Sequence, residues 1–291
     1  MRLGSRLRWL KIRVRRWLRT YASGIFTVLT LGSGFYLLSY YFLAPESQIA
    51  APGQGFGCAA SIRIRLDYVN LVLLEEEEPP QLWLYGRLKF EDQRPTGPGP
   101  YYLMFVLPFH VLGRIESSSV FPSYWNYTLL EGGASVSYAT YTNSSLARGD
   151  FNIGFYISRT YMAAYRGITT IFLPLETLVG GETVGDLQSK LKVSLFDPPQ
   201  MTVYITLPLS ADNVQAFPET SSRTPYVREG RAMNSIKWDL TVPESISLSY
   251  IDRETASFYD FVLILGGLLL GTGVSGVHNW LNRLTAGGSK T

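Results

Sequence analysis

The side chains that could do acid–base or metal chemistry are few in this chain and far apart. It has two histidines, His110 and His278, and a single cysteine, Cys58. Transition-metal sites gather several imidazole or thiolate ligands, so a histidine-based metal cluster is excluded. His110 follows Phe109 in an apolar run, which favours a structural role for this imidazole over a catalytic one.

Four consecutive carboxylates, Glu75–Glu78, stand directly before Pro79-Pro80. Calcium accepts oxygen ligands in loose geometries, so such a run is a candidate cation site. However, consecutive side chains on an extended chain point to alternate sides, and the aspartate spacing of a calcium loop is absent. We therefore interpret the run as a solvated hairpin turn and predict no metal site.

Enzyme chemistry has only weak support in the sequence. A carboxylate pair such as Asp150 with Asp197 or Glu176 could work as acid and base if the strands carrying them met in a cleft, and this alternative stays open. Ser117–Ser119 form no nucleophile elbow, and Gly53–Gly57 lacks the helix and lysine of a phosphate-binding loop. We predict no catalytic residue and no cofactor, and hence a protein that is not an enzyme.

The elements that carry these residues are organised around two uncharged apolar stretches near the ends of the chain. Ile25–Leu43 and the stretch from Phe261 to about Val277 can each cross about 30 Å of hydrocarbon as a helix. Residues 1–44 carry a net charge of +8, residues 45–260 carry −7 and residues 261–291 carry +2. Because basic residues flank membrane spans on the cytoplasmic side, we predict a plasma-membrane protein with both termini in the cytoplasm and its centre outside.

This layout predicts that the chain has six parts. They are a basic amphipathic cytoplasmic segment (1–22), transmembrane helix 1 (23–44), a stalk (45–60), an extracytoplasmic β domain (61–258), transmembrane helix 2 (259–279) and a cytoplasmic tail (280–291).

A cleaved signal peptide is the alternative for the first span. Arg15-Arg16 followed by Trp17-Leu18 resembles part of a twin-arginine export signal, although Arg19 interrupts the expected hydrophobic pair. The apolar stretch is longer than the roughly 7–15 residues of a signal core, which favours retention of the span.

The basic segment is expected to contact lipid. Its apolar residues recur every three or four positions, as on a helix that lies in the membrane interface. The arginines expected to bind anionic headgroups are Arg13, Arg15, Arg16 and Arg19. Nucleic acid is not an expected partner, because phospholipid is the nearer polyanion.

Gly267, Gly271 and Ser275 recur every fourth residue in the second span. Small residues at this spacing let another helix backbone approach closely. The partner is either the first span, where Thr30 and Gly34 form a shorter small-residue ridge, or the same helix in a second copy. The second alternative predicts a homo-oligomer.

Between the spans, apolar and polar residues alternate with a period of two. Runs such as Met201–Leu207 and Ile236–Val242 predict about ten short strands, separated by Pro/Gly clusters, with no helical segment. This pattern predicts an all-β ectodomain, an antiparallel β-sandwich of immunoglobulin-like or jelly-roll type, flanked by two transmembrane α-helices.

Several residues of this domain are candidates for contacts outside it. Asn126 and Asn143 begin glycosylation sequons. Cys58 is expected to be a free thiol in the stalk, and an intermolecular disulfide is the alternative. The aromatic residues near Asn126 could contact a protein or glycan ligand, although packing in the core is the commoner fate of such side chains; they are Tyr124, Trp125 and Tyr127.

Two function classes remain. The leading hypothesis is a non-enzymatic, membrane-anchored module that binds or scaffolds a protein or glycan outside the cell. The alternative is a two-span channel or an accessory subunit of a channel or transporter, because two spans around a β-rich ectodomain resemble the layout of acid-sensing and ATP-gated cation channels. Those ectodomains are cysteine-rich, whereas this one holds only Cys58.

Overall fold

A computed structural model describes most of the chain. The described residues are 3–44, 46–49, 54–61, 64–90, 99–115, 124–130, 133–141, 149–176, 180–196, 200–228, 231–242 and 244–288. The chain forms two compact units, a helical unit made of residues 1–45 and 254–291 and a β unit made of residues 46–253.

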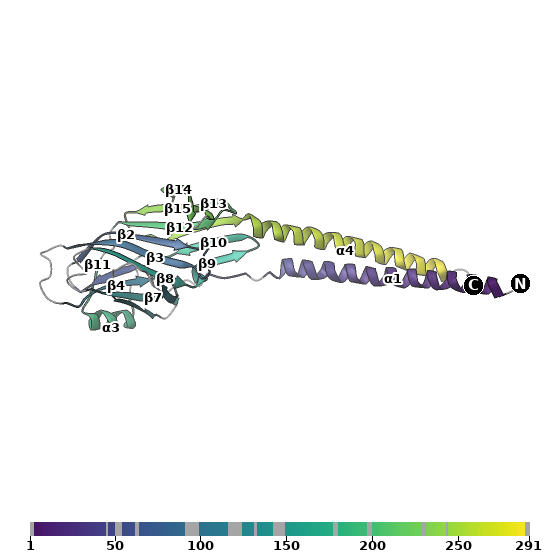
Figure 1. The fold of residues 1–291 in the computed structure, drawn as a ribbon, viewed down its shortest axis with the longest axis horizontal. Helices are drawn as coiled ribbons and strands as arrows, with labels where there is room; N and C mark the ends of the chain where they lie inside the picture. The colour runs from purple at the N-terminus through teal and green to yellow at the C-terminus, as the bar shows by residue number, and fades with distance from the viewer. Residues whose placement is uncertain are drawn as a thin grey trace. The chain divides into compact units, whose positions relative to one another are not determined.

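The helical unit consists of the two terminal helices. α1 spans Leu3–Phe42 and α4 spans Arg253–Gly288, and the two run side by side in Figure 1. Each contains a segment long and apolar enough to cross a membrane: Tyr21–Phe42 with mean hydropathy 1.4, and Arg253–Arg283 with 1.8. The predicted pair of apolar terminal helices is confirmed.

Within the described residues, the β unit holds sixteen strands, one 3-10 helix and one short α-helix. The strands are β1 (Gly57–Ala60), β2 (Ile64–Leu74), β3 (Gln81–Phe90), β4 (Tyr101–Leu107), β5 (Val111–Ile115), β6 (Tyr124–Leu129), β7 (Ser135–Tyr141), β8 (Asp150–Ile157), β9 (Met162–Tyr165), β10 (Ile168–Leu173), β11 (Ser194–Phe196), β12 (Met201–Pro208), β13 (Ala211–Phe217), β14 (Ser222–Arg228), β15 (Arg231–Leu240) and β16 (Ile246–Asp252). The helices are η2 (Arg159–Tyr161) and α3 (Glu182–Leu191).

The strands form three sheets. Sheet A has the order β11-β1-β4-β7-β6, sheet B the order β14-β15-β12-β2-β3-β8-β5, and sheet C the order β13-β16-β10-β9. The β-rich fold is confirmed, but the prediction of purely antiparallel pairing was wrong at one place. β12 pairs with β2 in parallel, with Val203 opposite Leu71. Strands so far apart in sequence can meet in either direction, and alternation within a strand does not distinguish the two.

The main core lies between the inner faces of the sheets. Phe105 of sheet A contacts Phe151 of sheet B with ring centroids 5.4 Å apart, and Trp125 of sheet A meets Phe155 of sheet B at 4.8 Å. Edge-to-face and tilted ring pairs of this kind add to the stability given by burial of the rings. Trp238 of sheet B is also fully buried and donates its indole N–H to the carbonyl of Pro218 at 2.9 Å.

α3 was not predicted, and it covers the outer face of sheet A (Figure 1). Its apolar residues Val184, Leu187 and Leu191 recur at helical spacing and pack against a second core cluster that includes Met104 and Val106 of β4. Both faces of β4 are therefore buried. The stretch from Leu191 looked like the start of a strand because Leu191, Val193 and Leu195 alternate. In the structure the helix ends there with Lys192 in the left-handed conformation, at φ 52°.

β1 lies inside the segment predicted to be a stalk. Phe56 and Cys58 are fully buried, and every residue of β1 is buried. Cys58 is a free thiol, as predicted, but its placement in a stalk was wrong. A strand of small residues that is buried on both faces shows no polar alternation from which it could be predicted. Burial raises the pKa of the Cys58 thiol far above its ordinary value. In the folded domain the thiol is therefore inaccessible to a second chain, and the intermolecular disulfide is ruled out there.

Candidate functional site

α1 and α4 pack against each other along a line of glycines and the side chains that contact them, here called the helix seam. A Cβ built on Gly34 would lie 2.8 Å from the backbone nitrogen of Leu270. On α4, a Cβ on Gly273 would lie 2.6 Å from Cγ of Leu31, and one on Gly276 would lie 2.6 Å from Oγ1 of Thr27. The absence of side chains at these glycines is what lets the two backbones approach, as in packed membrane helices.

The seam follows a heptad-like spacing. On α1 its members are three and four residues apart, which keeps them on one face of the helix; they are Gly24, Thr27, Leu31, Gly34 and Leu38. Thr27 and Thr30 are buried, and their hydroxyls donate to the carbonyls of Ser23 and Thr27 within the helix. The helix thus satisfies these hydroxyls itself, which keeps the seam free of unpaired donors at these two positions.

An aromatic cluster lies at one end of the seam. Tyr40 stacks on Tyr259 with ring centroids 6.2 Å apart and meets the edge of Phe258 at 6.3 Å. Tyr41 also contacts Tyr259. Aromatic residues with a polar tip favour the boundary between hydrocarbon and water. The cluster therefore has the composition expected where both helices leave a bilayer.

The predicted packing residues Gly267, Gly271 and Ser275 are exposed on α4 and do not belong to the seam. A Cβ added to Gly267 or Gly271 would meet no atom within 4 Å. α1 instead contacts the neighbouring small residues Gly266, Gly273 and Gly276. Packing of the predicted row against the first span is therefore not what the structure shows, and packing against a second copy stays a prediction.

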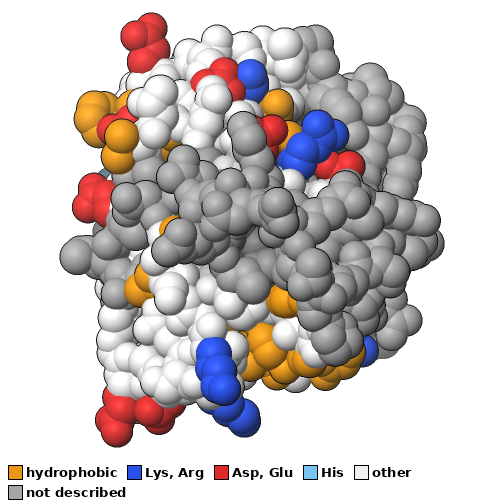
Figure 2. Space-filling view, turned by 90° about the vertical axis from the view of Figure 1, so that its left-hand side faces the viewer, with side chains coloured by type: hydrophobic (Ala, Val, Ile, Leu, Met, Phe, Trp, Pro, Cys, Tyr) orange, Lys and Arg blue, Asp and Glu red, His pale blue; other side chains and the backbone are white. Residues whose placement is uncertain are grey.

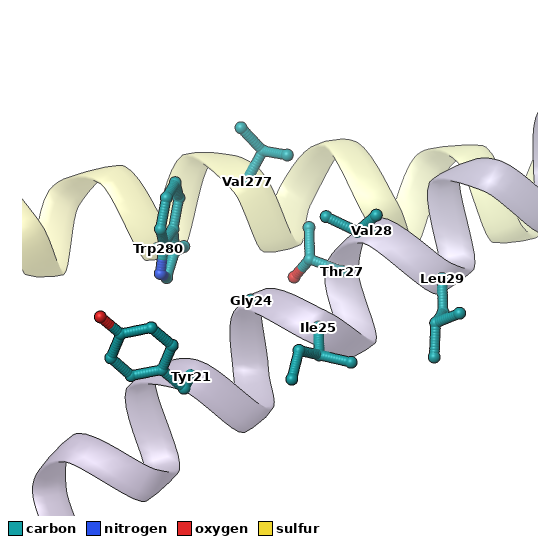
Figure 3. A pocket seen from close by; sticks show the side chains of 8 residues that line it. All are labelled: Tyr21, Gly24, Ile25, Thr27, Val28, Leu29, Val277 and Trp280. Atoms are coloured by element: carbon teal, nitrogen blue, oxygen red, sulfur yellow. The ribbon is translucent and has the colours of Figure 1, made fainter.

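The seam opens into a pocket between the middle of α1 and the C-terminal part of α4 (Figure 3). The pocket has a volume of about 510 Å³, and its lining is almost entirely apolar. Its residues are Tyr21, Gly24, Ile25, Thr27, Val28, Leu29, Val277 and Trp280. Figure 3 shows Tyr21 and Trp280 at the same end of the pocket. The side chains of the lipid-contact arginines Arg13, Arg15, Arg16 and Arg19 lie outside the described residues, although their backbone belongs to α1.

A second candidate site lies in the β unit, around Glu75. This residue follows β2 and is only 6% exposed, so the interpretation of the whole acidic run as a solvated turn was wrong at this position. The Tyr250 hydroxyl donates to Oε2 of Glu75 at 3.4 Å, and Nε of Arg159 lies 3.7 Å from Oε1. Only Glu78, whose side chain is 83% exposed, behaves as the turn hypothesis expected.

Neighbouring groups extend this polar cluster. Thr206 of β12 donates to Oε2 of Glu76 at 2.7 Å. The other oxygen of Glu76 and the hydroxyl of Tyr161 are buried without a hydrogen-bond partner among the described residues. Burial raises the pKa of Glu75, and the nearby Arg159 cation offsets only part of that effect. The cluster therefore joins sheets B and C through a carboxyl group that burial pushes toward its neutral form.

Glu75→Gln is expected to change how stability depends on pH. Because the folded-state pKa of Glu75 lies above its ordinary value of 4.5, the folded chain holds this proton more tightly than the unfolded chain. The stability that Glu75 contributes is present below about pH 4.5 and is lost as the pH rises through the folded-state pKa. Glutamine stays neutral throughout, so the variant should gain in free energy of unfolding relative to the wild type over that rise.

Urea unfolding of the full chain in mild detergent, followed by tryptophan fluorescence from about pH 4 to about pH 8, measures this difference. Glu78→Gln is the control in the same acidic run, because the Glu78 side chain is 83% exposed, and it should differ less from the wild type than Glu75→Gln does. Parallel profiles for Glu75→Gln and the wild type would contradict the assignment.

The carboxylates proposed for an acid–base pair have separate partners. Asp150 is exposed and forms an ion pair with Arg87, at 2.9 Å. Glu176 accepts a hydrogen bond from the Ser245 hydroxyl at 3.3 Å. Asp197, Ser117–Ser119 and Asn143 lie outside the described residues. The half-buried His110 accepts a hydrogen bond through its backbone carbonyl from Ser158, at 2.9 Å.

The aromatic residues around Asn126 are mostly part of the core. Trp125 is buried against Phe155, and Tyr127 packs against the same core cluster, which leaves Tyr124 exposed. The side-chain oxygen of Asn126 accepts from the backbone of Tyr127 at 2.9 Å. Glycosylation of Asn126 and Asn143 stays a prediction.

The β unit also has a hollow on sheet C, where β13 bulges away from β16 between Asp212 and Gln215. The hollow has a volume of about 520 Å³, and Ile168, Val214 and Tyr250 are among its lining residues. Figure 2 shows a different face of the β unit, on which charged and hydrophobic side chains of the described residues are scattered in small groups. The hollow at the strand bulge on sheet C is a concave surface on which a partner of the β unit could bind.

No protein-family model matches this sequence, and no curated protein matches it.

Proposed function

We propose that this protein is an integral membrane protein of the plasma membrane whose β unit forms an extracytoplasmic β-sandwich and acts as a non-enzymatic binding or scaffolding module. The observation that carries the proposal is the outer surface of the helix pair. Phe26, Val28 and Ile264 are each 68% exposed, and the apolar windows of α1 and α4 are only 11% and 17% buried. Exposed apolar surface of this extent is unfavourable in water and favourable in hydrocarbon.

The charge distribution supports the orientation. Residues 1–44 hold eight basic and no acidic side chains, which by the positive-inside rule keeps both termini in the cytoplasm and the β unit outside. The ring contacts between sheets A and B support the sandwich, and the hollow on sheet C offers a place for a protein or glycan partner.

Self-association through α4 is a further part of this proposal. Gly267, Gly271 and Ser275 form an exposed row on the face of α4 that α1 leaves open. This row could pack against the same row of a second copy, because small residues on both helices allow the two backbones to approach closely.

Membrane fractionation with protease protection tests the proposal. We expect a chain tagged at its C-terminus to stay in the membrane at alkaline pH and to leave it only with detergent. Protease added outside intact cells should remove the β unit and leave the tag protected. Release of the chain without detergent, or an intact mass that lacks about the first 45 residues, would overturn the two-span topology.

A further inference from the structure

The pocket between α1 and α4 combines an apolar interior with a polar end. Ile25, Val28 and Leu29 line it and are each at least 60% exposed, so the pocket opens sideways. Under the proposed function this opening faces the bilayer, and the inference below rests on that function. A volume of about 510 Å³ lies in the range of ligand pockets, about 300–1,000 Å³.

The polar end carries groups suited to a lipid headgroup region. The Tyr21 hydroxyl and the Trp280 indole nitrogen lie there (Figure 3). Tyrosine and tryptophan favour the level of the headgroups. Because Gly24 has no side chain, the space beside Trp280 stays open. A Cβ on Gly24 would lie 3.4 Å from Nε1 of the indole.

Basic residues stand next to this end on both helices. Arg19 comes two positions before Tyr21 on α1, and the exposed Arg283 comes three positions after Trp280, one turn along α4. Residues 1–44 and 261–291 contain no acidic side chain that could neutralise these cations. Basic pockets between membrane helices on the cytoplasmic side are known to favour anionic lipid headgroups.

We propose that this pocket binds one anionic phospholipid, with an acyl chain between Val28 and Val277 and its phosphate beside the exposed Arg283. Two contributions combine in this site: burial of the acyl chain in the apolar pocket, and attraction between the phosphate and the basic side chain at the polar end. A zwitterionic lipid with the same chains gains the first contribution and much less of the second.

Native mass spectrometry of the detergent-purified full chain tests the proposal with two probes, phosphatidylglycerol and phosphatidylcholine with identical acyl chains. The wild type should retain one phosphatidylglycerol in preference to phosphatidylcholine. Arg283→Gln should weaken phosphatidylglycerol retention about fivefold, the factor that corresponds to about 1 kcal/mol per basic residue near the surface. Phosphatidylcholine retention should not change.

Gly24→Leu fills the pocket and should reduce retention of both lipids. Gly32→Leu is its matched control on the same helix, because a Cβ at Gly32 meets no atom within 4 Å. Equal retention of the two lipids by the wild type, or equal behaviour of Gly24→Leu and Gly32→Leu, would overturn the lipid site. Should Gly24→Leu disturb the helix pair, the Arg283→Gln comparison still decides. A chain that stays membrane-bound without this preference refutes only the lipid site, whereas a chain released without detergent refutes the proposed function.

Discussion

Gly34→Leu should force α1 and α4 apart and destabilise the helix pair by about 1–3 kcal/mol, the usual cost of overpacking. At Gly34 a Cβ would lie 2.8 Å from the backbone nitrogen of Leu270 and 3.0 Å from the carbonyl oxygen of Gly266. Backbone atoms inside a helix cannot rotate away as a side chain can. The two helices must therefore separate or shift along each other.

A reporter disulfide across the seam can measure this separation. A Cβ on Gly276 would lie 3.4 Å from Cβ of Thr27, close to the Cβ–Cβ distance of about 3.5–4.5 Å in disulfides. The double substitution Thr27→Cys, Gly276→Cys, made with Cys58→Ala, should oxidise readily in the otherwise native chain. Adding Gly34→Leu should reduce the oxidised fraction, as read by intact mass after alkylation.

The matched control is Gly271→Leu, which places the same side chain on the open face of α4. It should leave the reporter disulfide unchanged, and equal oxidation in the Gly34 and Gly271 variants would contradict the seam.

Light scattering on the double variant Gly267→Leu, Gly271→Leu tests the separate proposal of self-association. A smaller particle than the wild type is expected, and an unchanged mass would exclude this row as the interface.

Gly86→Ala should lower the free energy of unfolding of the β unit by about 1–3 kcal/mol. Gly86 lies in β3 directly opposite Phe151 of β8, and the Phe151 ring covers it. A Cβ at Gly86 would overlap Cζ of Phe151 and lie 2.6 Å from the backbone oxygen of Tyr68. Phe151 also contacts Phe105 of sheet A, so a displaced ring would disturb the packing between sheets A and B.

Urea unfolding of the full chain in detergent, followed by tryptophan fluorescence, measures the effect of Gly86→Ala. Gly113→Ala in β5 is the control, because its Cβ would lie at an ordinary 3.7 Å from Tyr156. Gly113→Ala should leave the free energy of unfolding unchanged or raise it by up to about 1 kcal/mol, since alanine lowers the entropy of the unfolded chain. Equal midpoints for the two variants would refute the close packing described at Gly86.

Two patterns in the sequence, long uncharged apolar runs and alternation of apolar with polar residues, determined the two element types that dominate this protein. Uncharged runs such as Ile25–Leu43 predict helices because only a long apolar segment can cross hydrocarbon. Alternation in runs such as Met201–Leu207 predicts strands because successive side chains point to opposite faces. Both signals are local, and the helices and most of the predicted strands are found where these patterns placed them.

Tertiary structure decided what these elements contact. Glu75 and Glu78 belong to one acidic run, yet Glu75 is buried against Tyr250 and Arg159 while Glu78 is exposed. Cys58 is buried in a strand whose two neighbours in the sheet, β4 and β11, are distant in sequence. The seam selects Gly266 and Gly273 over Gly267 and Gly271, because the rotation of a packed helix depends on the facing surface. Residue type and spacing thus determine the element and its candidate faces, whereas burial, pairing and charge partners depend on contacts between distant parts of the chain.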